Sequence, residues 1–152
     1  MKILVDADSC PKAARELVLR TTVRLRIPAV FAANRPIPGI EGENIVMEIC
    51  PAGDNSADDR ITELAESGDL AVSRDLNLAK RLLEKGVTVI DDRGRLFSAG
   101  SINELLSLRD FTVNLAEYGL GAERTANYGK KELKVFADSL DRQLVKIQKA
   151  NN

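Results

Sequence analysis

Short apolar segments alternate with segments of helical periodicity along most of this chain, and this alternation constrains the fold more than any other feature. Apolar and β-branched runs predict strands at 3–6, 27–32, 44–49, 70–73 and 87–90. Apolar residues at helical spacing predict helices after the first strand, within 53–68, at 76–85, at 102–118 and across 133–147. Strands separated by helices form a mostly parallel sheet that is covered on both faces. The predicted fold is therefore an α/β three-layer sandwich with additional carboxy-terminal helices.

The length and the breaks in the pattern indicate a single domain over 1–152. A chain of 152 residues suits one domain with one buried core. The loop 119–129, which contains three glycines, comes nearest to a boundary. We expect it to join the sheet to a carboxy-terminal segment, so that 119–152 forms a loop and a helix that packs on the domain. Ser9 is expected to cap the first helix, with Pro11 in its first turn.

The sequence contains no histidine and only two cysteines, Cys10 and Cys50. Catalytic triads built on histidine and zinc sites built on histidine or paired thiolates are therefore excluded. Metal chemistry would have to use oxygen ligands, which favour magnesium, manganese or calcium. No apolar run is long enough to span a membrane, and the first residues do not resemble a secretion signal. We expect a cytoplasmic protein without membrane contact, and the oligomeric state is not predicted.

Aspartates follow several of the predicted strands. Asp6 ends the first strand, Asp8 comes two residues later, and Asp75 lies two residues beyond the fourth strand. Asp54 and Asp58 are one helical turn apart at the start of the helix within 53–68. In an open α/β sheet, ligands bind beyond the carboxyl ends of the strands, so these acids are expected near one edge.

A divalent cation would offset the repulsion between crowded carboxylates. Such a cation can activate water and stabilise charge on a phosphodiester, so an aspartate cluster without histidine is sufficient for phosphodiester hydrolysis. Each acid also has an ordinary structural explanation. Asp75 and Asp54 are typical helix caps, Asp91 and Asp92 suit a turn, and Asp59 and Asp69 are expected to be solvated. Asp6 is the hardest to explain in this way because it follows apolar residues.

Basic and polar residues near this edge are candidates for phosphate contact, although most surface cations contribute little to stability. The candidates are Arg74 and Lys80, with Arg109 on the helix 102–118. Arg109 falls among apolar residues, so we expect it to be partly buried and paired with a carboxylate. Cys10 is expected to be a buried, unreactive thiol.

Five motifs together resemble the bacterial YaiI/YqxD family, a family of unassigned function that is similar to PIN-like and NYN nuclease domains. The motifs are VDADSCP at 5–11, GDNSADD at 53–59, GDLAVSRDLNLA at 68–79, DDRG at 91–94 and LRDF at 108–111. The resemblance implies a PIN-like fold, magnesium or manganese as cofactor, and RNA as substrate.

Carried over residue by residue, the resemblance implies that Asp6, Asp58 and Asp75 are the catalytic and metal-binding acids. It assigns Ser73 as the hydroxyl of the site, with Asn77 beside it, and Asp8 and Asp54 as auxiliary ligands. Asn77 stands where many PIN-like sites carry another acid.

Two other functions fit the same residues. In a haloacid-dehalogenase-like phosphatase, Asp6 would be the nucleophile and Asp8 the general acid. Alternatively, the domain would keep its acids for structure or metal and bind RNA or a protein partner without cleaving it.

Overall fold

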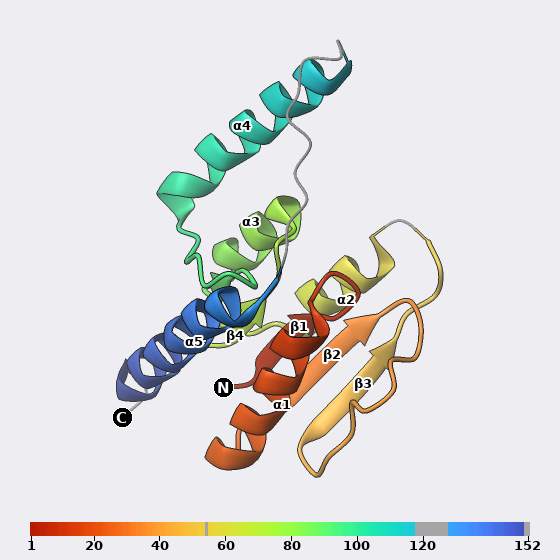
Figure 1. The fold of residues 1–152 in the computed structure, drawn as a ribbon, viewed down its shortest axis with the longest axis vertical. Coiled ribbons are helices and arrows are strands. Elements are labelled where there is room, and N and C mark those ends of the chain that lie inside the picture. Colours follow the sequence, from red (N-terminus) through yellow and green to blue (C-terminus); the bar gives the residue numbers. More distant parts are fainter. Residues whose placement is uncertain (54, 118–127, 151–152) are drawn as a thin grey trace.

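The computed structural model describes residues 1–53, 55–117 and 128–150, and it describes the side chains of all of these residues except 110–117. Its core is one parallel sheet (Figure 1). The described strands are β1 (Ile3–Asp6), β2 (Ala29–Ala33), β3 (Ile45–Ile49), β4 (Leu70–Val72) and β5 (Thr88–Ile90). They lie in the order β3-β2-β1-β4-β5, and each neighbouring pair is parallel. The predicted α/β class is confirmed.

Helices cover both faces of the sheet. They are α1 (Lys12–Leu25), α2 (Ser56–Leu64), α3 (Leu76–Glu84), α4 (Ala99–Glu117) and α5 (Lys130–Ala150). Side chains alternate along a strand, so Ile3 and Val5 face α1 and α5, whereas Leu4 faces α2 and α3. The two resulting apolar layers give the predicted three-layer sandwich. Among the described residues, no helix combines the length and apolar character needed to cross a bilayer.

The turn after α1 shows why β2 begins two residues later than the sequence predicts. Arg26 adopts a left-handed conformation with φ of 54°, and its amide bonds to the Thr22 carbonyl. The Ile27 amide also bonds to the Thr22 carbonyl, at 3.1 Å. Ile27 therefore closes the helix rather than opening the strand.

The expected cap at Ser9 is wrong. Pro11 occupies the cap position of α1, and no side chain there accepts a bond from the helix amides. The Ser9 hydroxyl instead donates to the Asp6 carboxylate Oδ2 at 3.0 Å. A buried carboxylate is a stronger acceptor for this hydroxyl, so Ser9 belongs to the site at the end of β1.

The strand order has a topological switch point between β1 and β4. The chain passes from β1 to β2 and β3 on one side, and then crosses to β4 on the other side of β1. At such a reversal, the connections leave in opposite directions and open a crevice at the carboxyl edge. Asp6 ends β1 and Ser73 follows β4, so both lie at this position.

Candidate site at the carboxyl edge of the sheet

Asp6 is the buried centre of this edge, with 8% of its surface exposed. It points to the same face as Leu4, which is the face covered by α2 and α3. The hydroxyls of Ser9 and Ser73 both donate to its Oδ2 at 3.0 Å. Burial raises the pKa of Asp6, and the negative charges of Asp75 and Asp8 raise it further, while the two serine hydrogen bonds lower it.

Asp75 joins this group through the start of α3. Its Oδ1 accepts hydrogen bonds from the amides of Asn77, at 2.9 Å, and Leu78, at 3.1 Å. The predicted cap is therefore confirmed. Its own amide donates to the Ser73 hydroxyl at 3.0 Å, which links Asp75 through Ser73 to Asp6. Capping and participation in the acidic group are thus compatible roles for one side chain.

Asp58 completes the group from the first turn of α2, where it is half-buried. The pKa of Asp58 is raised to about 6, first by burial and then by the charges of Asp75 and Asp6. A hydrogen bond with the Asp75 carboxyl raises it further, and the Arg81 guanidinium partly opposes the shift. Two carboxyls this close repel when both are ionised, and a proton on Asp58 relieves the repulsion.

The structure therefore brings together the three aspartates that the sequence singled out, from β1, α2 and the start of α3. Within the described part of the chain, no Lys or Arg lies within ion-pairing distance of Asp6, Asp58 or Asp75. In those same residues, no three acidic, thiol or imidazole groups adopt the arrangement of a formed metal site. The charge of Asp75 acts on both Asp6 and Asp58, but the three side chains do not form a closed metal site.

Asp8, one of the two predicted auxiliary ligands, makes contacts of its own at the surface. Asp8 is exposed, its Oδ2 accepts from the Asn34 amide at 2.8 Å, and its Oδ1 lies 3.8 Å from Arg35 Nε. Asp8 therefore fixes the loop after β2, while its charge still acts on Asp6. Asp54 lies outside the described residues.

The residues predicted to contact phosphate lie on different elements of the fold. Asn77 and Lys80 are exposed on α3, and the Arg74 side chain is 56% exposed with its Nη1 3.8 Å from Asp92 Oδ2. Arg109 is exposed on α4, so the expectation that it is partly buried is wrong. Figure 1 shows the cause, because α4 extends past α3 and the later turns leave the core. Arg109 is therefore not part of the edge.

Asp92 is the residue that sequence reasoning missed. Asp91 behaves as predicted for a turn, since its Oδ1 accepts from the amides of Arg93 and Arg95. Asp92 is instead buried, 4% exposed, and directed toward Arg74. Burial raises the pKa of Asp92, while Arg74 lowers it. The only signal in the sequence was its position after β5, which turn chemistry explained equally well.

Cys10 is a buried thiol beside this edge, as predicted. Burial, and then the charge of Asp92, raise the pKa of Cys10 to about 12. A nucleophilic cysteine needs its thiolate form, so this residue does not act as a nucleophile at neutral pH.

The comparisons with known proteins agree with the resemblance seen in the motifs. The sequence model of the uncharacterized YaiI/YqxD family matches residues 4–146. A UPF0178 protein of Treponema denticola is 45% identical over 149 residues, which cover 98% of this chain and 95% of that protein. A UPF0178 protein of Treponema pallidum is 42% identical over 147 residues, which cover 97% of this chain and 83% of that protein. No solved structure gives a significant match.

Proposed function

The chain belongs to the YaiI/YqxD family, and from the carboxyl edge of its sheet we propose that it is a divalent-metal-dependent hydrolase of phosphodiester bonds. The observation that carries the proposal is the meeting of Asp6, Asp58 and Asp75, in which the charge of Asp75 raises the pKa of both Asp6 and Asp58. A cation would relieve the same repulsion as the proton on Asp58 does, and would leave all three groups ionised.

The donor set suits magnesium or manganese. All the ligands would be carboxylate oxygens, because the sequence has no histidine and its thiols are buried. Asp6, Asp58 and Asp75 would hold the ion, with Asp8 and Asp54 as auxiliary ligands. When bound, the ion supplies a water of lowered pKa and stabilises the charge that develops on the phosphate.

The surrounding residues have separate roles in this proposal. Ser9 and Ser73 hold Asp6 through two hydrogen bonds of 3.0 Å, which fixes the direction of its carboxylate. Arg74 is half-exposed beside Asp75 and directed by Asp92, so its guanidinium can bind a phosphate oxygen. Lys80 and Asn77 lie on the first two turns of α3 and border the same edge. The resemblance to PIN-like domains supports RNA as the substrate.

The phosphatase alternative is less well supported by the contacts of Asp8. A general acid must present a proton to the leaving group. The Asn34 amide instead donates to Asp8 Oδ2, and Arg35 forms an ion pair with Asp8 Oδ1. Both contacts suit an ionised carboxylate. Attack by water is therefore preferred to a phosphoaspartate on Asp6. Trapping such an adduct on Asp6 would reverse this preference.

The test is hydrolysis of a labelled single-stranded RNA with manganese by the wild type, Asp58→Asn and Asp59→Asn. Asp59 is the matched control because it is the neighbouring acid on α2, exposed and paired with Arg81 at 2.9 Å. We expect Asp58→Asn to lose at least about 100-fold in rate, in the range of losses seen when groups acting on the transition state are removed, and Asp59→Asn to stay near the wild type. Equal loss in both variants would remove the special role of Asp58, and an RNA that the wild type binds but does not cleave would favour the non-catalytic alternative.

A further inference from the structure

The two helices on one side of the sheet carry a charge opposite to that of the rest of the chain. Residues 12–26 and 130–150 contain eleven of the 22 Lys and Arg but four of the 23 Asp and Glu, which gives a net charge of +7. The whole chain has a net charge of −1, so the remainder carries −8. The cations of this α1–α5 face are Lys12, Arg15, Arg20, Arg24, Arg26, Lys130, Lys131, Lys134, Arg142, Lys146 and Lys149.

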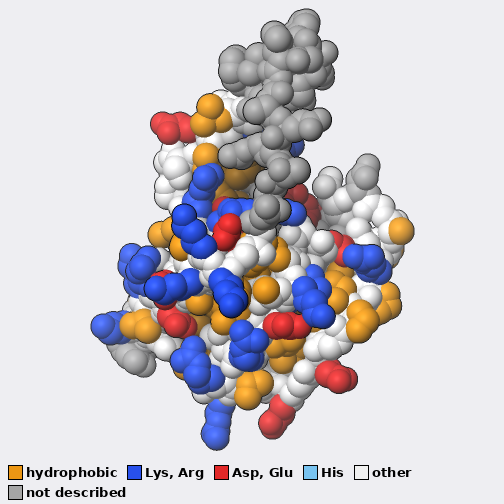
Figure 2. Space-filling model, in the orientation of Figure 1, with side chains coloured by type: hydrophobic (Ala, Val, Ile, Leu, Met, Phe, Trp, Pro, Cys, Tyr) orange, Lys and Arg blue, Asp and Glu red, His pale blue; other side chains and the backbone are white. Residues whose placement is uncertain are grey.

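The α1–α5 face is one continuous surface. The two helices pack on the same apolar layer, in which Val18 of α1 and Leu140 of α5 are both buried. Arg24 of α1 pairs with Asp141 of α5 at 3.2 Å, which ties the helices together. Figure 2 views the molecule from this side and shows Lys and Arg side chains spread over it, with few acidic side chains between them.

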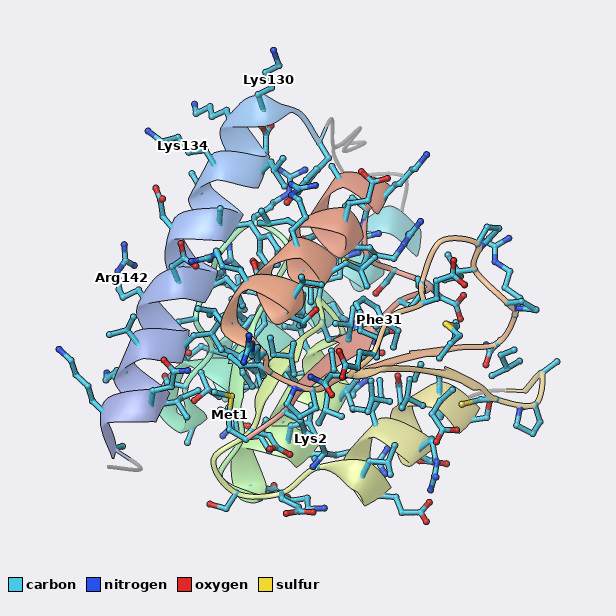
Figure 3. All side chains as sticks on the ribbon, turned by 90° about the horizontal axis from the view of Figure 1, so that it is seen from below. Met1, Lys2, Phe31, Lys130, Lys134 and Arg142 are labelled. Carbon is cyan, nitrogen blue, oxygen red and sulfur yellow. The ribbon has the colours of Figure 1, made fainter. Side chains whose placement is uncertain are left out.

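Most of these cations are available to a partner. All are exposed except Arg15, which is half-buried and donates to the Cys10 carbonyl. Among the side chains that the structure describes, ion pairs engage Lys12 and Arg24 of this set. Figure 3 shows Lys130, Lys134 and Arg142 projecting from α5 away from the body of the protein. A surface with this excess of solvated cations attracts an extended polyanion.

We propose that the α1–α5 face binds the phosphate backbone of a double-helical nucleic acid. Base stacking on single strands needs exposed aromatic rings, whereas Phe136 is the one aromatic residue in 12–26 and 130–150 and is fully buried. Membrane-surface helices insert Trp, Phe or Leu, whereas the exposed large apolar residues here are the separate valines Val23, Val135 and Val145. With base stacking and membrane insertion excluded, the remaining kind of contact is with phosphate groups, and such contacts suit a duplex.

The surface is linked to the acidic edge by the directions of its helices. α1 begins six residues after Asp6, and Tyr128, just before α5, donates to the Asp92 carbonyl at 2.6 Å beyond β5. Both helices therefore start at the carboxyl edge and run away from it. The inference does not rest on hydrolysis, because it concerns a different face of the molecule.

The test measures binding of fluorescent duplexes about 20 base pairs long, one of RNA and one of DNA, by anisotropy with a chelator present. The variant Lys134→Glu/Arg142→Glu reverses two exposed charges on α5. Its matched control, Lys85→Glu/Arg109→Glu, reverses two exposed charges, one at the carboxy-terminal cap of α3 and one on α4, at the other side of the sheet. We expect the α5 variant to bind at least about tenfold more weakly at about 50 mM salt, with a salt slope less steep by about two. The control should keep nearly wild-type affinity.

Thermal melts would show that both variants stay folded, and Lys134→Gln/Arg142→Gln would give a smaller loss in the same direction. Binding of either duplex with this pattern supports the inference, and a preference for RNA would add contact with its 2′-hydroxyls. Equal loss in both charge-reversal variants, no binding of either duplex, or binding to phosphatidylserine vesicles alone would overturn it. Because Asp6→Asn should still bind duplexes, loss of hydrolysis and loss of binding are separable.

Discussion

Buried acids at the two edges of the sheet have opposite environments. At the amino edge, Asp69 is 3% exposed, and its Oδ2 lies 2.7 Å from the Lys2 ammonium. It also accepts from the amides of Lys2, at 3.0 Å, and Glu66, at 2.8 Å. At the carboxyl edge, Asp6 accepts hydrogen bonds from two neutral serine hydroxyls, and its charged neighbours are other acids.

This contrast separates an acid that is paired inside the fold from acids that are not. Asp69 is paired inside the fold, so it links Lys2 to the turn before β4, and removal of either partner would leave a buried charge uncompensated. At the carboxyl edge, no Lys or Arg of the described residues lies within ion-pairing distance of Asp6, Asp58 or Asp75, and burial disfavours the charged forms of Asp6 and Asp58. The proposed external cation would balance these charges, and each of the following predictions tests that difference.

The largest effect on stability is expected from Asp69→Ala. Removing one partner of a buried ion pair leaves the other partner and two backbone amides without their acceptor. We expect the free energy of unfolding to fall by about 3 kcal/mol in urea titrations. A fall below about 1 kcal/mol would mean that the pair at the amino edge contributes no more than a surface pair.

A smaller loss is expected from Ser73→Ala. The Ser73 hydroxyl donates to Asp6 and accepts from the Asp75 amide, so its removal breaks both bonds in a buried position. We expect a loss of about 1.5 kcal/mol in the free energy of unfolding, together with weaker manganese binding. Ser107→Ala is the control, because Ser107 is exposed on α4. Unchanged manganese binding in Ser73→Ala would separate this hydroxyl from the site.

The smallest effect, and one of opposite sign, is expected from Asp58→Asn. The pKa of Asp58 is raised from 3.8 to about 6, so the folded state keeps a proton that the unfolded state has already lost between these pH values. Stability from this group is therefore complete below pH 3.8 and is lost as the pH rises through about 6. The asparagine variant should lack this decline and gain about 0.5 kcal/mol at neutral pH, because solvent screens a half-exposed group.

Urea titrations across that pH range would measure the difference between the wild type and Asp58→Asn. Asp59→Asn should follow the wild type, since Asp59 is exposed and paired with Arg81. If Asp58→Asn is less stable than the wild type above pH 6, the carboxyl edge would resemble the amino edge after all, with its acid satisfied inside the fold.

Residues that act through local sequence could be predicted, and residues that act through distant partners could not. The apolar run before Asp6 and the cap position of Asp75 are visible in the sequence, so the parallel sheet and its acidic edge followed from them. Asp69 was expected to be solvated, and that expectation is wrong. Its partner Lys2 is 67 residues away, and nothing near Asp69 in the sequence indicates that pairing.

Three further corrections have separate physical origins. Ser9 bonds to Asp6 rather than to helix amides, since Pro11 occupies the cap position of α1 and leaves Ser9 before the helix. Arg109 lies within an apolar periodicity, but α4 extends beyond α3, the helix on which it packs (Figure 1). Asp92 has a turn-like sequence, and only the meeting of β4 and β5 brings it to Arg74.

The most direct test of the central claim is a calorimetric titration of manganese into the wild type, Asp6→Asn and Asp59→Asn. We expect saturable binding at neutral pH by the wild type and Asp59→Asn, and loss of that binding in Asp6→Asn. Affinity of the wild type should fall below pH of about 6, where Asp58 takes up its proton. Equal heats from the wild type and Asp6→Asn would contradict the claim that Asp6, Asp58 and Asp75 share one cation.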